Sequence, residues 1–188
     1  NYVGKVALAA VGASTPIINM LIGFFMGIST GAGVVIAQFF GAGDLSKMKK
    51  AIHNSIALTL VIGVVLTVIG LVFNDPILKA IGVPNDVFSE ASTYLSIYFW
   101  SLIFVMIYNM GSGILRSVGD SKRPLYFLIF SSIINIVLDF LFVKNFGFGV
   151  AGAGYATLIA QAISAIMVMY VLMKTEDSYK VVLKDIKF

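Results

Sequence analysis

The chain has 188 residues and a formal net charge of +4; 59% of the residues are hydrophobic, 12% are charged, and the mean hydropathy is +0.98. A water-soluble domain carries about 25% charged residues, so this composition excludes a separate soluble domain and indicates an integral membrane protein. The chain contains no cysteine and a single histidine, which excludes disulfides, cysteine nucleophiles and a multi-histidine metal centre.

Long apolar stretches predict five membrane-spanning helices, because one helical span needs about 20 mostly apolar residues. These stretches are continuous rather than alternating, which excludes strands as spanning elements. We therefore expect an all-α integral membrane fold, with spans at about residues 16–40, 52–73, 91–115, 124–143 and 150–173.

The ends of the predicted spans carry residues that cap or terminate helices. Asp44 and Asp120 each follow a glycine and are expected to cap the next helix. The Asp75-Pro76 pair is expected to end the second span. Residues 1–173 thus form one transmembrane unit, and the amphipathic residues 174–188 are expected to connect it to further sequence.

The lysines and arginines predict the orientation of the chain in the membrane. Ten of the thirteen lie on the side that holds the loops at 41–51 and 116–123 and the connector at 174–188, and three lie on the other side. The positive-inside rule places the richer side in the cytoplasm of a multi-pass plasma-membrane protein. The basic excess is therefore a topology signal, and no nucleic-acid partner is expected.

Asp139 is the only charged residue inside a predicted span. Insertion scales assign a central aspartate a cost of about 2.5 to 3.5 kcal/mol, so it must face protein or water, and such an acid marks an ion or substrate path. The competing interpretation is an acid that only holds two helices together by a hydrogen bond.

Two further polar residues belong with this acid. Asn135 lies one turn before Asp139 on the same helical face. Thr157 in the next span lies at a similar depth, judged by a rise of about 1.5 Å per residue. A carboxylate, an amide and a hydroxyl that converge would form either a proton site or a sodium site. No other metal and no cofactor beyond this coupling ion are expected.

A stripe of polar and aromatic residues in the third span is a candidate lining for a substrate cavity. Tyr98, Tyr108 and Ser112 fall on one helical face, and aromatic rings attract organic cations. Gln161 in the fifth span shares the face of the candidate ion site and is assigned to the same cavity. Tyr94, near the end of its span, is instead expected to belong to the interfacial aromatic belt.

Small residues in the first span form a second stripe. Gly23, Gly27 and Gly31 are four residues apart, a spacing that lets helices approach closely, so we expect a helix-packing face. Gln38, near the end of this span, and His53, at the start of the next, are expected at the membrane interface.

As a set, the motifs of this chain resemble those of a known transporter family. The sequence is similar to the N-terminal lobe of the multidrug and toxic compound extrusion (MATE) family of cation-coupled efflux antiporters. The matching stretches run in the family's order over nearly the whole chain: residues 8–13 (LAAVGA), 31–38 (GAGVVIAQ), 41–44 (GAGD), 113–122 (GILRSVGDSK), 135–139 (NIVLD), 149–153 (GVAGA) and 156–157 (AT).

The resemblance implies a twelve-helix, two-lobe antiporter, in which the five spans here match helices two to six. The first helix and the second lobe would then be missing partners of the same protein, and residues 174–188 would match the linker between lobes. Asn135, Asp139 and Thr157 match the family's cation-site positions. The implied function is export of amphipathic organic cations in exchange for protons or sodium ions, with membrane lipid as the surrounding partner.

Two other functions stay open on the sequence. A lipid flippase of the broader related superfamily would need a larger and more cationic cavity. A channel-like helical oligomer would show passive flux without a gradient. The sequence shows no paired acid, Ser/Lys or Ser/His dyad or metal cluster, so we do not expect an enzyme.

Overall fold

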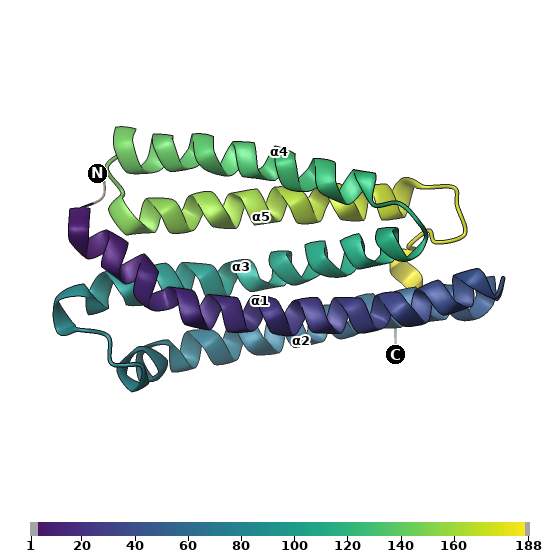
Figure 1. Ribbon diagram of the computed structural model, residues 1–188, viewed down its shortest axis with the longest axis horizontal. Coiled ribbons are helices and arrows are strands. Elements are labelled where there is room, and N and C mark those ends of the chain that lie inside the picture. The colour runs from purple at the N-terminus through teal and green to yellow at the C-terminus, as the bar shows by residue number, and fades with distance from the viewer. Residues whose placement is uncertain (1–3, 187–188) are drawn as a thin grey trace.

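The computed structural model describes residues 4–186, so residues 1–3 of the predicted transmembrane unit and 187–188 of the predicted connector lie outside the described part. The helices are α1 (Gly4–Gly41), α2 (Leu45–Ala80), α3 (Asn85–Ser117), α4 (Lys122–Asp139) and α5 (Gly149–Lys174) (Figure 1). A π-helix, Phe140–Asn145, continues α4, and a short 3₁₀ helix, Leu183–Asp185, follows α5. Across residues 4–186, five helices are long and apolar enough to cross a membrane, which confirms the fold class.

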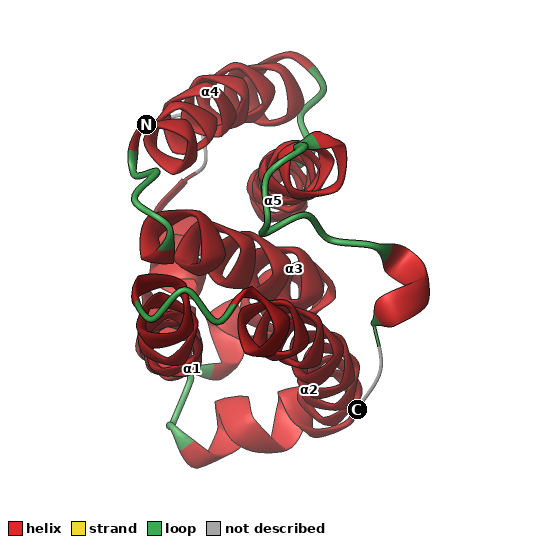
Figure 2. Ribbon diagram, turned by 90° about the vertical axis from the view of Figure 1, so that its right-hand side faces the viewer, coloured by secondary structure: helices red, strands yellow, loops and turns green. Residues whose placement is uncertain are grey.

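Successive helices run in opposite directions, and the bundle has two distinct ends. The lysine-rich end holds the α1–α2 and α3–α4 connections and the C-terminal segment, residues 175–186; the opposite end holds the α2–α3 and α4–α5 connections (Figure 1). Viewed end-on, α3 lies at the centre, with α1 and α2 on one side and the α4–α5 hairpin on the other (Figure 2). Because α4 packs mainly on α5, it is the outermost helix.

Two clusters of buried side chains hold the bundle together. The first lies toward the opposite end, between α1, α2 and α3, and includes Phe25, Leu95 and Leu102. The second lies toward the lysine-rich end, where α5 and the C-terminal segment also contribute; Ile52 and Leu172 are fully buried there. The C-terminal segment is thus part of the packed structure rather than an extended tail.

Several helices are longer than the predicted spans, and α2 corrects one expectation. α1 has 38 residues and α2 has 36, which correspond to roughly 55 Å each, well beyond the 30 Å hydrocarbon core. The prediction that Asp75-Pro76 ends the second span is wrong, because α2 continues to Ala80. The last turns of α2 bend away from the helix axis in both views (Figures 1 and 2), and Pro76 lies inside the helix near its end. Proline removes one backbone donor and kinks a helix without having to end it.

The two predicted glycine-aspartate turns are confirmed at the lysine-rich end. Asp44 and Asp120 each accept a hydrogen bond, at 3.1 Å, from the backbone N–H three residues later. The preceding glycines, Gly43 and Gly119, have φ angles of 71° and 94°, which a residue with a Cβ rarely adopts. Lys47 hydrogen-bonds to the Asp44 carboxylate and lowers the pKa of that carboxyl from its ordinary value of 3.8.

None of the described helices packs closely on Gly23, Gly27 or Gly31, so the packing role of this stripe stays a prediction. A Cβ placed on any of the three would meet no described atom within 4 Å, because this face of α1 points out of the bundle. Close approach of α1 to α3 occurs instead at Gly113 of α3, where a Cβ would lie 2.5 Å from the Ser29 hydroxyl oxygen. The three glycines do form one stripe, but α1 is rotated so that a different face of the helix meets α3.

Candidate functional site

Two buried polar groups without partners lie near the C-terminal end of α4, on Asn135 and Asp139. Asp139 is the last residue of α4, and Asn135 lies one turn before it. Atom Oδ1 of Asp139 and atom Nδ2 of Asn135 are both shielded from solvent and have no hydrogen-bond partner among the described residues. Native proteins satisfy nearly all buried polar groups, so two orphaned groups on one helical face need an explanation.

Thr157 on α5 lies level with these two residues. α4 and α5 form an antiparallel hairpin, and a Cβ on Gly152 of α5 would lie 3.1 Å from the backbone carbon of Phe142. Each residue stepped away from this contact along one helix matches one residue along the other, which puts Thr157 about level with position 137, between Asn135 and Asp139. The Thr157 hydroxyl donates to the Ala153 carbonyl at 3.0 Å, so its lone pairs stay available as ligands.

Tyr94 of α3 lies near this group of residues. The sequence predicts a place in the interfacial aromatic belt; in the structure Tyr94 is half-buried and lies close enough to Asp139 for the two side chains to interact electrostatically. The sequence held one signal, since Tyr94 shares a helical stripe with Tyr98. Its proximity to Asp139 could not be predicted, because the two residues are 45 positions apart in the chain.

The chemistry of this group suits a small cation or a proton. An ionised carboxylate without a partner in a low-dielectric site is strongly destabilised, so it takes up a proton or a cation. Sodium and other hard cations prefer oxygen ligands, which the Asp139 carboxylate, the Asn135 amide oxygen and the Thr157 hydroxyl supply. The donor set therefore fits either coupling ion.

A π-helix begins at the residue after Asp139. Phe140–Asn145 has π-type pairing, and the turn that follows contains Gly147 with a φ angle of 68°. Stacked and tilted rings of Phe142, Phe146 and Phe148 close the hairpin beside it. Single-turn π segments occur frequently at functional sites, and here one directly follows Asp139. This π-helix could not be predicted from the sequence, because an apolar run has the same composition in an α- and a π-helix.

The four residues assigned to a substrate cavity occupy different environments. Tyr98 is 7% exposed and belongs to the first core cluster. The Tyr108 hydroxyl donates to the Pro124 carbonyl at 2.9 Å and ties α3 to the start of α4. Ser112 is buried, with an orphaned hydroxyl oxygen, and Gln161 is half-buried on α5. Both tyrosines thus have packing contacts, and a role for the four residues in substrate binding stays a prediction.

Comparison with known proteins gives a consistent set of matches. The family model described as MatE matches residues 1–141. The chain is 36% identical over 177 residues to the probable multidrug resistance protein YoeA of Bacillus subtilis, and 27% identical over 177 residues to the multidrug export protein MepA of Staphylococcus aureus. These alignments cover 92% and 94% of this chain but only 38% and 39% of the relatives.

Solved structures give the same result. An inward-facing multidrug resistance MATE family transporter of the MOP superfamily superposes with a TM-score of 0.92 and 31% identity, over 99% of this chain and 43% of that one. A MOP superfamily transporter from Pyrococcus furiosus superposes with a TM-score of 0.91 and 31% identity, over 98% of this chain and 41% of that one.

The chain therefore spans about two fifths of the length of the relatives and structures it matches. The family model covers most of the chain, and the structural match extends over nearly all of it. Five antiparallel apolar helices with a buried acid on α4 agree with both. The chain belongs to the MATE family of membrane transporters.

Proposed function

We propose that this chain is a lobe of a secondary antiporter, which exports amphipathic organic cations in exchange for protons or sodium ions. The observation that carries the proposal is the buried, unpartnered carboxylate oxygen of Asp139 beside the unpartnered amide of Asn135, with Thr157 level with both. The names of the relatives, which refer to multidrug resistance and multidrug export, support drugs as the exported class.

The coupling step follows from the charge of Asp139. With a proton or a sodium ion bound, the site is neutral and compatible with a dry, closed lobe; without it, the carboxylate must be hydrated or paired. Asn135 and Thr157 would hold the cation through oxygen atoms and would orient the carboxylate. Two states are then stable: the dry, closed lobe with the ion bound, and the lobe with a hydrated or paired carboxylate and no ion. Export and ion entry are linked because the other two combinations, a bare carboxylate in the closed lobe and a bound ion in the hydrated lobe, are disfavoured.

An efflux assay tests this function. Proteoliposomes that carry the transporter are loaded with a fluorescent organic cation, and either a proton or a sodium gradient is imposed. We expect efflux that depends on one of the two gradients and stops when an ionophore for that ion dissipates it. Dye flux that persists at an unchanged rate without any gradient would contradict antiport and would favour a channel-like oligomer.

The orientation of the lobe is part of the same proposal. We place the lysine-rich end in the cytoplasm of a plasma-membrane protein, because the positive-inside rule applies to its short loops.

Cysteines introduced singly at the exposed residues Ser46 and Ser121 should react only with membrane-permeant reagents in intact cells. A cysteine at Asn85, at the opposite end, should react with impermeant reagents added outside. The chain has no native cysteine, so labelling reports these sites alone. Reversed labelling would overturn the orientation.

A further inference from the structure

The C-terminal segment, residues 175–186, folds back onto the lysine-rich end of α2. The Val181 backbone N–H donates to the Leu172 carbonyl at 2.8 Å, which turns the chain back along α5. Tyr179 and Val181 are 8% and 2% exposed and pack in the same cluster as Ile52 of α2. Apolar contacts therefore hold the segment against α2, and a polar contact adds to them.

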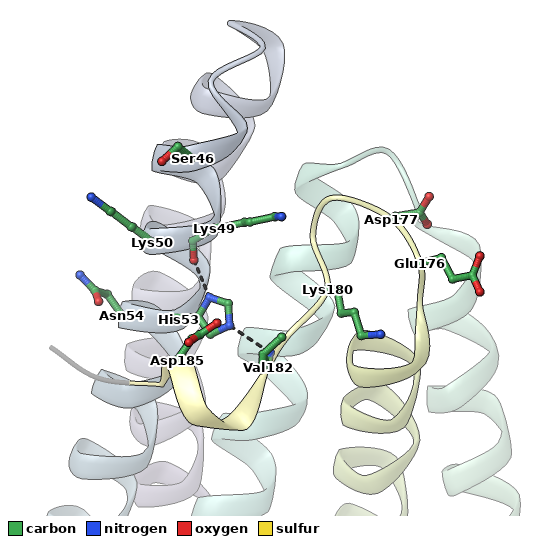
Figure 3. Close-up of a pocket in the computed structure, with 10 residues that line it drawn as sticks. All are labelled: Ser46, Lys49, Lys50, His53, Asn54, Glu176, Asp177, Lys180, Val182 and Asp185. Atoms are coloured by element: carbon green, nitrogen blue, oxygen red, sulfur yellow. Dashed lines mark hydrogen bonds between the residues drawn. The ribbon is translucent and has the colours of Figure 1, made fainter.

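That polar contact is made by His53 of α2, which is 6% exposed. Its Nδ1 lies 2.7 Å from the Lys49 carbonyl oxygen, and its Nε2 lies 3.0 Å from the backbone nitrogen of Val182 (Figure 3). A carbonyl can only accept, so Nδ1 carries the hydrogen; the Val182 N–H can only donate, so Nε2 must present its lone pair. Both bonds exist together only when the imidazole is neutral.

We propose that His53 is a pH-sensitive latch that holds the C-terminal segment against α2 when neutral and releases it when protonated. A proton on Nε2 would put two donors face to face, and it would leave the Val182 N–H without its acceptor on His53. Histidine is the side chain whose charge changes between about pH 5 and 8. Docking therefore requires the neutral imidazole and is lost as the pH falls.

The charged groups around the latch are balanced. A cavity of about 630 Å³ lies between α2 and the segment. The charged residues that line it are Lys49 and Lys50 of α2, and Glu176, Asp177, Lys180 and Asp185 of the segment (Figure 3). Three cations and three anions therefore surround the latch.

Two of these acids bear directly on the latch. Asp185 lines the same cavity as His53 (Figure 3) and is the acid of the segment that would pair with a protonated His53 and oppose release. Hydrogen bonds from the hydroxyls of Thr175 and Tyr179 lower the pKa of Asp177 from its ordinary value of 3.8. Asp177 therefore stays ionised throughout the range in which histidine titrates and cannot be the source of a transition there.

Distance measurement between two spin labels tests the latch. Cysteines replace Ser121 in the α3–α4 connection and Leu183 in the C-terminal segment, both exposed; a control pair joins Ser121 to the exposed Leu45. At pH 8 we expect one narrow distance population for the Leu183 pair. At pH 5 we expect a second, broader population, with the ratio of docked to released segment about tenfold lower, whereas the control pair should not change.

His53→Gln is the decisive variant, because its amide oxygen can accept from the Val182 N–H at any pH. We expect the Leu183 pair in this variant to show no response between pH 8 and 5. A wild-type distribution that is the same at both pH values would overturn the latch and would indicate that Asp185 retains the segment. A pH response that survives in His53→Gln would overturn it as well, since another group would then be titrating.

Discussion

Replacing Asp139 by asparagine should abolish gradient-driven efflux in the transporter that carries this lobe, while the protein stays folded. Asparagine has the size of the protonated acid, so the buried site keeps its packing, but an amide cannot gain and lose a proton or neutralise a sodium ion. The expected result is dye efflux reduced to the level of passive leak, measured in proteoliposomes under the gradient that drives the wild type. Asn135→Ala and Thr157→Ala should reduce efflux less, because each removes one neutral ligand and leaves the charge.

Asp86→Asn provides the matched control. Asp86 is an exposed acid in the first turn of α3, so the substitution removes the same charge away from the α4–α5 site and should leave efflux unchanged. Efflux by Asp139→Asn at the wild-type rate, with the wild-type dependence on the gradient, would reduce Asp139 to a helix-packing contact and place coupling elsewhere in the transporter.

Gly113→Leu should have the largest effect on stability among the glycine substitutions considered. The new Cβ would lie 2.5 Å from the Ser29 hydroxyl and 3.2 Å from the Ser29 carbonyl oxygen, which is backbone and cannot rotate away. α1 must then move from α3 and lose the bond from the Ser29 hydroxyl to the Asn109 carbonyl, at 2.6 Å. Overpacking and the lost bond together should destabilise the chain by about 2 to 4 kcal/mol, seen as a lower Tm in detergent.

Gly31→Leu is the control for this prediction. Gly31 lies on the outward face of α1, where a Cβ meets no described atom within 4 Å. The same change of residue should therefore alter stability by no more than about 0.5 kcal/mol. Equal losses of Tm in both variants would mean that the contact between Gly113 and Ser29 does not set the distance between α1 and α3.

The sequence was sufficient for features that depend on spacing along one helix or across one short hairpin. The face shared by Asn135 and Asp139 follows from the 3.6-residue helical period, and the short α4–α5 connection fixes the level of Thr157. The turns at Asp44 and Asp120 depend on residues only three apart. Such local geometry varies little between proteins, so composition and spacing predict it.

Features that depend on how a whole helix is rotated or docked could not be predicted from the sequence. The outward direction of Gly23, Gly27 and Gly31 depends on how α1 is rotated against α3, which their spacing does not fix. His53 was expected simply at the membrane interface, whereas its acceptor atom bonds a residue 129 positions away.

Infrared difference spectroscopy of the carboxyl group of Asp139 tests the central claim most directly. The protein in lipid is titrated with acid and, separately, with sodium ions, and the spectra are compared with those of Asp139→Asn. We predict a buried carboxyl signal that changes with pH or with sodium ions and is absent from the variant. A difference spectrum that is the same in both proteins would contradict the assignment of the coupling ion to this site.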